Sequence, residues 1–321
     1  MRKKKNTGLR EIAERTGFNI GTVSRALTGR AGISRENARR ILDLAYEMGY
    51  CNSAEKRVAV ILPPIRNAMQ WYTLALLNAI CQEAAERSVC LELIFADQAD
   101  RMLERSVSGI LSLDYQNFSL HKLCEIKPFV TINNFSNIPE DMYSVSSDMK
   151  NGIFQAVRLL YSYGHRKIGL YISGGRTQNS LELEKAFRQE LLARSMDGEA
   201  VWGILEEKVR FYAFGSIMSL LEKKVTAIIA NGESVSSEIL AGIRLCGKRV
   251  PEDVSLITWE VPLFSKFQAP PLTTVSQDFP RLAATAFDLL DRIAARENPP
   301  FVHTVDCMLI ERNSVSVPRK T

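Results

Sequence analysis

The sequence has no hydrophobic run long enough to cross a membrane. Its apolar stretches stay below the ~18–20 residues that a membrane-spanning helix needs. The basic start, Met1 to Lys5, is followed by no apolar segment, so the second part of a secretory signal is missing. These absences predict a cytoplasmic protein that does not contact membranes.

Cysteine and histidine are scarce and scattered. No two of the six cysteines have Cys-x-x-Cys spacing, which excludes a zinc ribbon and favours a reducing compartment. The three histidines, His121, His165 and His303, are far apart, and no Gly-x-Ser-x-Gly nucleophile elbow is present. We therefore expect no metal, no cofactor and no enzymatic activity.

Positive charge is concentrated in a small part of the chain. Residues 1–57 hold 13 Lys/Arg and 6 Asp/Glu, a net charge of +7, whereas residues 58–321 hold 28 and 30, a net charge of −2. A basic head on a near-neutral body is typical of nucleic-acid binding. A charged, solvated surface with no partner is the alternative that charge alone leaves open.

Residues 8–50 show only helical periodicity. Gly17 permits a tight turn after a first short helix, Asn19 is a candidate N-cap of a second, and Ser34 is one for a third. The apolar faces of the first two helices comprise Leu9, Ile12, Ala13 and Thr16, and then Val23, Ala26 and Leu27. Three short helices with a turn at a glycine predict a helix-turn-helix DNA-binding headpiece over residues 1–50.

From residue 58 the pattern changes to strands that alternate with helices. This alternation predicts parallel sheets with helices on both faces, and the length of residues 58–321 favours two lobes with a ligand cleft between them. Residues 51–57 form the predicted linker. The expected strands are Val58–Leu62, Leu91–Phe95, Gly109–Leu113, Phe129–Ile132, Ile168–Ile172, Ala227–Ala230 and Val254–Thr258. The expected helices are Trp71–Arg87, Gly152–Tyr163, Phe211–Glu222 and Phe279–Ala295.

Several motifs carry a family resemblance. The segment Leu9–Leu27, with its string Thr22-Val23-Ser24-Arg25-Ala26-Leu27, resembles the DNA-binding headpiece of the lactose/galactose repressor (LacI/GalR) family. The body carries further matches at Gly164-His165-Arg166-Lys167-Ile168, from Gly247 to Ile257, from Pro270 to Gln277, and at Leu309-Ile310-Glu311-Arg312-Asn313-Ser314. The resemblance therefore extends over nearly the whole chain.

The resemblance implies both a fold and a function. The implied fold is an all-α helix-turn-helix headpiece joined to an α/β, two-lobed, periplasmic-binding-protein-like domain. The implied function is a homodimeric transcriptional repressor that binds a near-palindromic DNA operator and responds to a small-molecule effector, such as a sugar, in the cleft. The alternative is a small-molecule binding protein or a sugar-processing enzyme with an unused DNA-binding head.

The second helix of the headpiece is the implied recognition helix. Arg25 is suited to bidentate hydrogen bonds with guanine, with a phosphate contact as the alternative. Ile20 and Gly21 stand where many relatives carry polar base-reading residues, and neither side chain can form a hydrogen bond. The predicted DNA-contacting residues are Asn19, Ile20, Gly21, Thr22, Ser24, Arg25 and Arg30.

The resemblance also implies effector-facing positions. The residues that match them are Trp71, Tyr72, Asp148, Asn231, Glu260, Gln277 and Phe279. Aromatic faces with carboxylate and amide groups suit a polyhydroxylated ligand, but core packing is the alternative for the three aromatic residues. Leu183 replaces an arginine and Gly232 a carboxylate of many relatives, so a different effector, or none, is also open.

The linker is shorter than in relatives. They carry a hinge helix whose leucine wedges into the minor groove, whereas only Cys51 to Arg57 separate Tyr50 from the strand at Val58 here. Because an inserted apolar side chain kinks DNA, we expect this chain to bend its operator less.

Overall fold

The computed structural model describes residues 8–27, 32–48, 56–64, 71–98, 107–113, 121–124, 127–133, 139–173, 178–202, 213–231, 236–262 and 264–319. The chain divides into two compact units. One comprises residues 1–57 and 88–90, and the other comprises residues 58–87 and 91–321. We call the helical part of the first unit the head and the second unit the body. Residues 51–55 of the predicted linker lie outside the described part of the chain.

The head contains three short helices, α1 (Leu9–Thr16), α2 (Ile20–Leu27) and α3 (Arg35–Glu47). Each helix contributes to one small core, in which Ile12, Val23 and Ile41 have no solvent exposure. The helical periodicity of the sequence thus produces the expected three-helix head.

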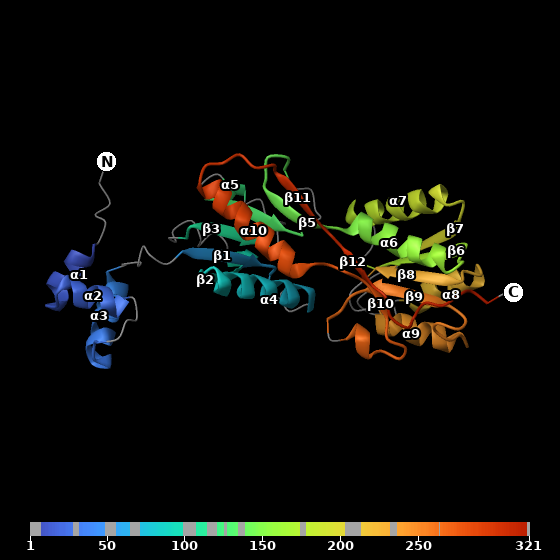
Figure 1. The fold of residues 1–321 in the computed structure, drawn as a ribbon, viewed down its shortest axis with the longest axis horizontal. Coiled ribbons are helices and arrows are strands. Elements are labelled where there is room, and N and C mark those ends of the chain that lie inside the picture. The colour runs from blue at the N-terminus through green and yellow to red at the C-terminus, as the bar shows by residue number, and fades with distance from the viewer. Residues whose placement is uncertain are drawn as a thin grey trace. The chain divides into compact units, whose positions relative to one another are not determined.

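The body contains two six-stranded sheets, each the centre of a lobe (Figure 1). The first sheet has the strand order β11-β5-β4-β3-β1-β2, and its strands from β11 to β1 are parallel. Helix α10 (Phe279–Ala294) packs against α4 (Trp71–Glu86) and against three of these strands, and α5 (His121–Cys124) is a single turn. The strands are β1 (Arg57–Leu62), β2 (Cys90–Phe95), β3 (Gly109–Ser112), β4 (Phe129–Ile132), β5 (Ser144–Asp148) and β11 (Val302–Asp306).

The second sheet has the order β12-β10-β9-β8-β6-β7, and β12 is its one antiparallel strand. One core lies under α6 (Met149–Ser162) and α7 (Gln178–Ala193), and another under α8 (Phe214–Glu222) and α9 (Ser236–Leu245), so helices cover both faces. The strands are β6 (Lys167–Ile172), β7 (Asp197–Trp202), β8 (Ala227–Asn231), β9 (Ser255–Trp259), β10 (Thr273–Ser276) and β12 (Met308–Ile310).

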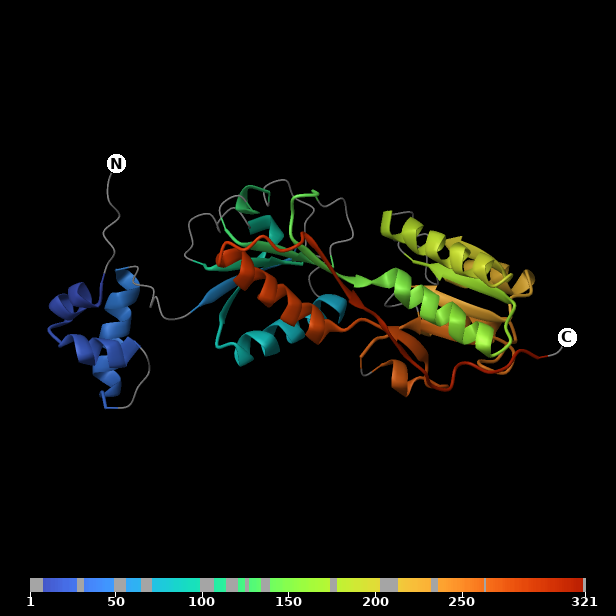
Figure 2. The ribbon, with the colours of Figure 1, turned by 45° about the horizontal axis from the view of Figure 1, so that its top comes forward.

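Three connections join the two lobes. They lead from β5 to α6, from β10 to α10 and from β11 to β12, and Figures 1 and 2 show them next to one another. Asp148 and Asp278 cap the helices that follow the first two connections, because each side chain accepts a hydrogen bond from a backbone N–H of the first turn. Cys307, in the third, is buried at 2% exposure.

The predicted fold class, a helical headpiece with two parallel α/β lobes, is confirmed. The seven expected strands correspond to β1, β2, β3, β4, β6, β8 and β9. The sequence analysis did not predict β5, β7, β10 and β11, because polar residues interrupt them: β5 reads Ser-Val-Ser-Ser-Asp and β7 begins Asp-Gly-Glu. It did not predict β12 because that strand is only three residues long.

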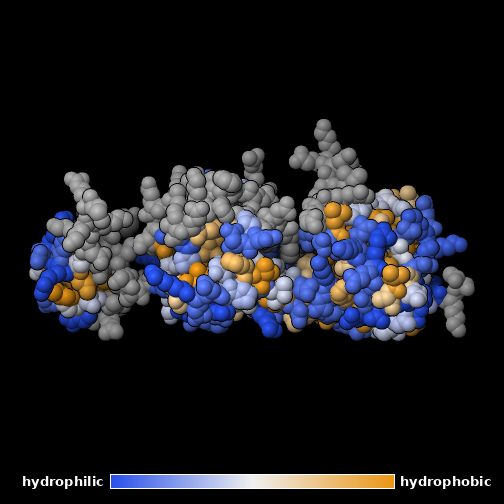
Figure 3. Space-filling view, turned by 90° about the horizontal axis from the view of Figure 1, so that it is seen from above, coloured by the Kyte–Doolittle hydropathy of each residue, from blue (hydrophilic) through white to orange (hydrophobic). Residues whose placement is uncertain are grey.

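No helix in the described part of the chain is long and apolar enough to cross a membrane. On the face of the molecule in Figure 3, hydrophilic residues cover most of the coloured surface, and the apolar areas are small and separated.

Candidate functional site

The head holds α2 at a fixed angle to α1 through a short capped turn. Gly17 ends α1 in the left-handed region, with φ of 76°, and its N–H donates to the Ala13 carbonyl oxygen at 3.0 Å. Asn19 caps α2, because its Oδ1 accepts a hydrogen bond from the Thr22 N–H at 2.7 Å. The two caps satisfy backbone groups that α1 and α2 leave unpaired at the turn.

The predicted DNA-contacting residues share the solvent side of α2. Val23 and Ala26 are buried in the head core, at 0% and 6% exposure, whereas Ile20, Gly21 and Arg25 are exposed. Thr22 and Ser24 are half-buried at the edges of this face, and Asn19 is exposed just before it. Arg30 lies outside the described residues.

Arg25 is the one ionisable residue in the sequence of α2. Its Nε donates a hydrogen bond to the Gly21 carbonyl oxygen at 3.2 Å, so its side chain runs back along the exposed face by one turn. The helix has no carboxylate that would repel DNA phosphates. On α1 and α3, by contrast, Arg15 and Arg39 each form an exposed ion pair with a carboxylate one turn away.

In the second lobe, three predicted effector residues follow adjacent parallel strands. Asn231 ends β8, Glu260 follows β9 and Gln277 follows β10, and these strands are neighbours in the sheet. Asp148 ends β5 in the first lobe. Ligands of open parallel sheets bind outside the carboxyl ends of the strands, which is where all four residues lie.

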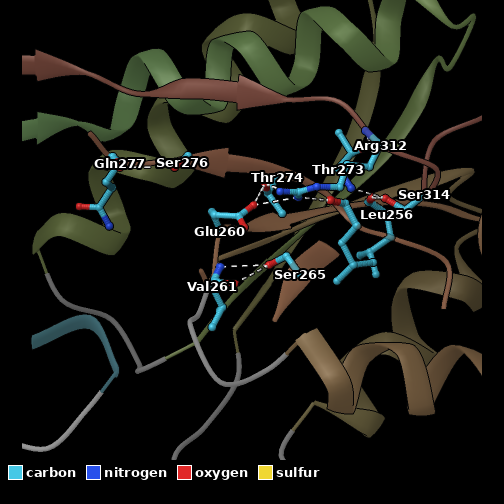
Figure 4. A network of polar contacts seen from close by, with 11 residues as sticks. Leu256, Glu260, Val261, Ser265, Thr273, Thr274, Ser276, Gln277, Arg312 and Ser314 are labelled. Atoms are coloured by element: carbon cyan, nitrogen blue, oxygen red, sulfur yellow. Dashed lines mark hydrogen bonds and ion pairs between the residues drawn. The ribbon is translucent and has the colours of Figure 1, made fainter. Parts of the chain in front are cut away.

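The carboxylate of Glu260 is held by its neighbours (Figure 4). Its Oε2 accepts hydrogen bonds from Arg312 Nη1 at 2.8 Å and from the Thr274 hydroxyl. The side chain of Glu260 is 10% exposed and that of Arg312 is 17% exposed, so this ion pair is largely shielded from water. The oxygen Oε1 has no hydrogen-bond partner among the described residues. Glu260 therefore has a fixed orientation with one oxygen available to a ligand.

Gln277 points away from that pair in Figure 4 and contacts the first lobe. Its Oε1 accepts hydrogen bonds from Asn133 Nδ2 at 2.7 Å and from Ser147 Oγ at 2.9 Å. The Ser147 N–H in turn donates to Asn133 Oδ1 at 2.6 Å. Because all three residues are at most 9% exposed, this network ties the β10–α10 connection to the ends of β4 and β5.

Asp148 lines a cavity of about 400 Å³. Ser146, Thr304 and Leu183 also line it, together with Lys150 and Glu182, whose side chains form an ion pair at 2.9 Å. One oxygen of Asp148 accepts the capping hydrogen bond from the Asn151 N–H at 2.9 Å. Leu183, which stands where many relatives carry an arginine, makes this part of the cavity wall apolar.

The three aromatic residues form a cluster of their own. Phe279, at the start of α10, lies edge-on to Trp71 and Tyr72 at the start of α4, with ring centroids 6.3 and 5.6 Å away. Trp71 Nε1 is buried and has no hydrogen-bond partner among the described residues. The rings thus pack on one another, while the indole N–H remains available as a donor.

Comparisons with known proteins agree with both units. Residues 157–315 match the model of the periplasmic binding protein-like domain. The HTH-type transcriptional repressor PurR of Edwardsiella ictaluri is 24% identical over 96% of each chain, and the HTH-type transcriptional regulator DegA of Bacillus subtilis is 25% identical over 91% of each chain. A solved structure, the lac repressor dimer bound to operator and the anti-inducer ONPF, has a TM-score of 0.72 and 18% identity, and covers 97% of this chain and 100% of its own. The chain is therefore similar along nearly its whole length to transcriptional regulators, and part of its body matches a periplasmic binding protein-like domain.

The motif around His165 has a structural role in the body. His165 is buried at 1% exposure, with Nδ1 at 2.8 Å from Thr226 Oγ1 and Nε2 at 2.9 Å from the Ser316 carbonyl oxygen. Burial lowers the pKa of this histidine, and the nearby Arg166 lowers it further, whereas the hydrogen bond with Ser316 acts in the opposite direction. The histidine therefore links the C-terminal segment to the second lobe.

Three residues of the body site escaped prediction. Asn133 and Ser147 hold Gln277, and Arg312 holds Glu260. Arg312 was visible as part of the closing LacI/GalR motif, but no spacing in the sequence pairs it with Glu260. Asn133 has φ of 48°, a backbone conformation that asparagine tolerates better than most residues, and it comes directly after β4.

Proposed function

We propose that this chain is a sequence-specific transcriptional repressor that binds a near-palindromic operator as a homodimer. The observation that carries the proposal is the exposed face of α2, where Ile20, Gly21 and Arg25 lie together on a helix that Asn19 caps. Two heads related by two-fold symmetry would place their α2 helices in successive major grooves about one helical turn apart.

Within each half-site, the residues have different roles. Arg25 donates two hydrogen bonds to a guanine. To reach the base, its side chain gives up the hydrogen bond with the Gly21 carbonyl oxygen. The hydroxyls of Thr22 and Ser24, at the edges of the exposed face, donate to phosphate oxygens. Arg30 and the other basic residues of the head supply phosphate contacts, which make binding steeply salt-dependent.

The body binds a small-molecule effector at the carboxyl ends of its strands. Asn231, Glu260 and Gln277 provide polar groups from one lobe, and Asp148 provides one at the end of β5 in the other. Trp71, Tyr72 and Phe279 form an aromatic wall on the side of the first lobe. An effector that prefers one arrangement of the lobes shifts the population between DNA-competent and incompetent states.

The site of action is the cytoplasm, where operator DNA is accessible. The linker between head and body is short, because α3 ends at Glu47 and β1 begins at Arg57. Asn52, within it, is the one residue that matches the hinge helix of relatives, and no leucine follows it. The chain therefore positions its heads without an apolar wedge in the minor groove.

Selection of bound duplexes from a random DNA pool tests this function directly. The wild-type chain should enrich an inverted repeat at ~0.1 M salt, a concentration at which specific binding still exceeds non-specific binding. Arg25→Ala should lose or change that repeat. Arg39→Ala, which removes an exposed cation on α3, should lower overall affinity and leave the enriched sequence unchanged. A folded wild-type chain that enriches nothing would favour the alternative, a small-molecule binding protein with an unused head.

A further inference from the structure

The first turn of α2 is unusual for a helix that reads DNA, because its exposed face is apolar. Ile20 is 44% exposed at the start of the helix and does not belong to the head core. Gly21 beside it has no side chain at all. The next exposed side chain with hydrogen-bonding groups is Arg25, which lies one turn further along α2.

The fold does not require a glycine at position 21. Its backbone is helical and not left-handed, and an added Cβ would meet only Asn19 Oδ1, at 3.4 Å. Glycine in a helix is less favourable than alanine by about 1 kcal/mol. A residue that weakens the helix and fills no structural need points to close approach of another surface.

The major groove offers one apolar group to such a surface. Among the four bases, only thymine presents a methyl group there, at C5, while the other groove positions present hydrogen-bond donors and acceptors. The Ile20 side chain has no hydrogen-bonding group. Its contact with a methyl group is therefore favourable, whereas contact with a polar base edge would desolvate that edge at a cost in free energy.

We propose that Ile20 reads the C5-methyl group of a thymine in each operator half-site, and that Gly21 lets the first turn of α2 approach the base edges closely enough for this contact. The inference rests on the proposed function. It assigns the specificity at these two positions to van der Waals contact, whereas Arg25 supplies specificity through hydrogen bonds.

Replacement of thymine by deoxyuridine tests the contact, because it removes the methyl group and leaves base pairing and hydrogen-bonding groups unchanged. Replacement of the contacted thymine in one half-site should lower the operator affinity about fourfold, as expected for the burial of one methyl-sized group. Symmetric replacement in both half-sites should lose about 15-fold, the product of the two. A cytosine at the same position should bind better when it is methylated at C5.

Protein variants show whether Ile20 makes the contact. Ile20→Ala should weaken binding to the thymine operator and make the affinity insensitive to deoxyuridine, whereas Ile20→Val should keep most of the difference. Leu42→Ala provides a matched control, because Leu42 is 45% exposed on α3, and this variant should retain the full response to deoxyuridine. An Ile20→Ala loss that is equally large on deoxyuridine DNA would assign the contact to another group and overturn the proposal.

Gly21→Ala separates close approach from folding. Alanine should raise the thermal stability of the head, because it favours the helix, and should lower operator affinity, because its methyl group meets the base edges. Unchanged operator affinity of the stable variant would contradict the role of Gly21. An enriched operator in which no thymine responds to deoxyuridine would overturn this inference alone, whereas the absence of any enriched operator would overturn the proposed function with it.

Discussion

The side-chain amide of Asn133 donates a hydrogen bond to Gln277 Oε1 at 2.7 Å. Asn133 follows β4 in the first lobe, and Gln277 lies where the chain crosses from β10 to α10. The contact therefore fastens one of the three lobe connections to a strand end that an effector at the carboxyl edge would approach. A residue expected to face the effector is thus also part of the joint between the lobes.

Replacement of Gln277 by methionine should destabilise the body. The variant leaves the buried Asn133 amide and Ser147 hydroxyl without their acceptor, which costs about 1–3 kcal/mol in the free energy of unfolding. Urea denaturation measures the change. Gln82→Met on the exposed surface of α4 is the control and should stay within about 0.5 kcal/mol of wild type. Equal effects of the two variants would show that the network contributes nothing.

The fold was more predictable than the site, and particular residues show why. Val58–Leu62 and Ile168–Ile172 are apolar because strands buried on both faces must be, so sequence reveals them. By contrast, β5 carries serines because its end belongs to the polar network around Gln277. Pairs such as Glu260 with Arg312 are 52 residues apart in sequence, and only tertiary structure brings them together.

The stability of the body should depend on the protonation of His165. Because burial lowers its pKa in the folded state, the unfolded chain binds the proton more readily below about pH 6.5, the usual pKa of histidine. This contribution to stability is therefore complete above pH 6.5 and is lost as the pH falls below it, by at most about 1.4 kcal/mol per pH unit. The free energy of unfolding, measured between pH 7.5 and 5.5, should fall less steeply in His165→Asn than in wild type. His303→Asn is the control and should retain the wild-type slope, and a slope unchanged in both would contradict the prediction.

A second copy of the chain should bind at the end of α9. Leu245 is 68% exposed there, and the Arg244 side chain donates to the Ala269 carbonyl oxygen. Phe264 and Phe267, in the segment that leads to Ala269, are also exposed. Phe267, at 73% exposure, is the most exposed side chain in this group. Exposed apolar patches of this kind mark protein interfaces.

Phe267→Asp should shift the chain from dimer to monomer in sedimentation velocity, because it places a charge in the interface. Leu192→Asp is a matched control on α7, since Leu192 is 82% exposed and lies on a different helix. It should leave the dimer intact. A dimer that persists in Phe267→Asp would place the interface elsewhere.

The operator should bend only slightly when the chain binds. The linker has no leucine after Asn52 that could wedge into the minor groove. Gel mobility of circularly permuted operator fragments measures the bend. A kink as large as that of relatives with a full hinge helix would contradict the absence of a wedge.

The ratio between specific and non-specific DNA affinity shows whether α2 reads DNA sequence. Fluorescence anisotropy with the full chain, at one salt concentration of about 0.1 M, compares the enriched operator with a scrambled duplex of equal length and composition. Sequence-specific regulators bind their sites at least about 10³-fold more tightly than other DNA. We expect a ratio of this order for wild type and a much smaller ratio for Arg25→Ala. A ratio near one for the folded wild-type chain would mean that α2 does not read DNA sequence.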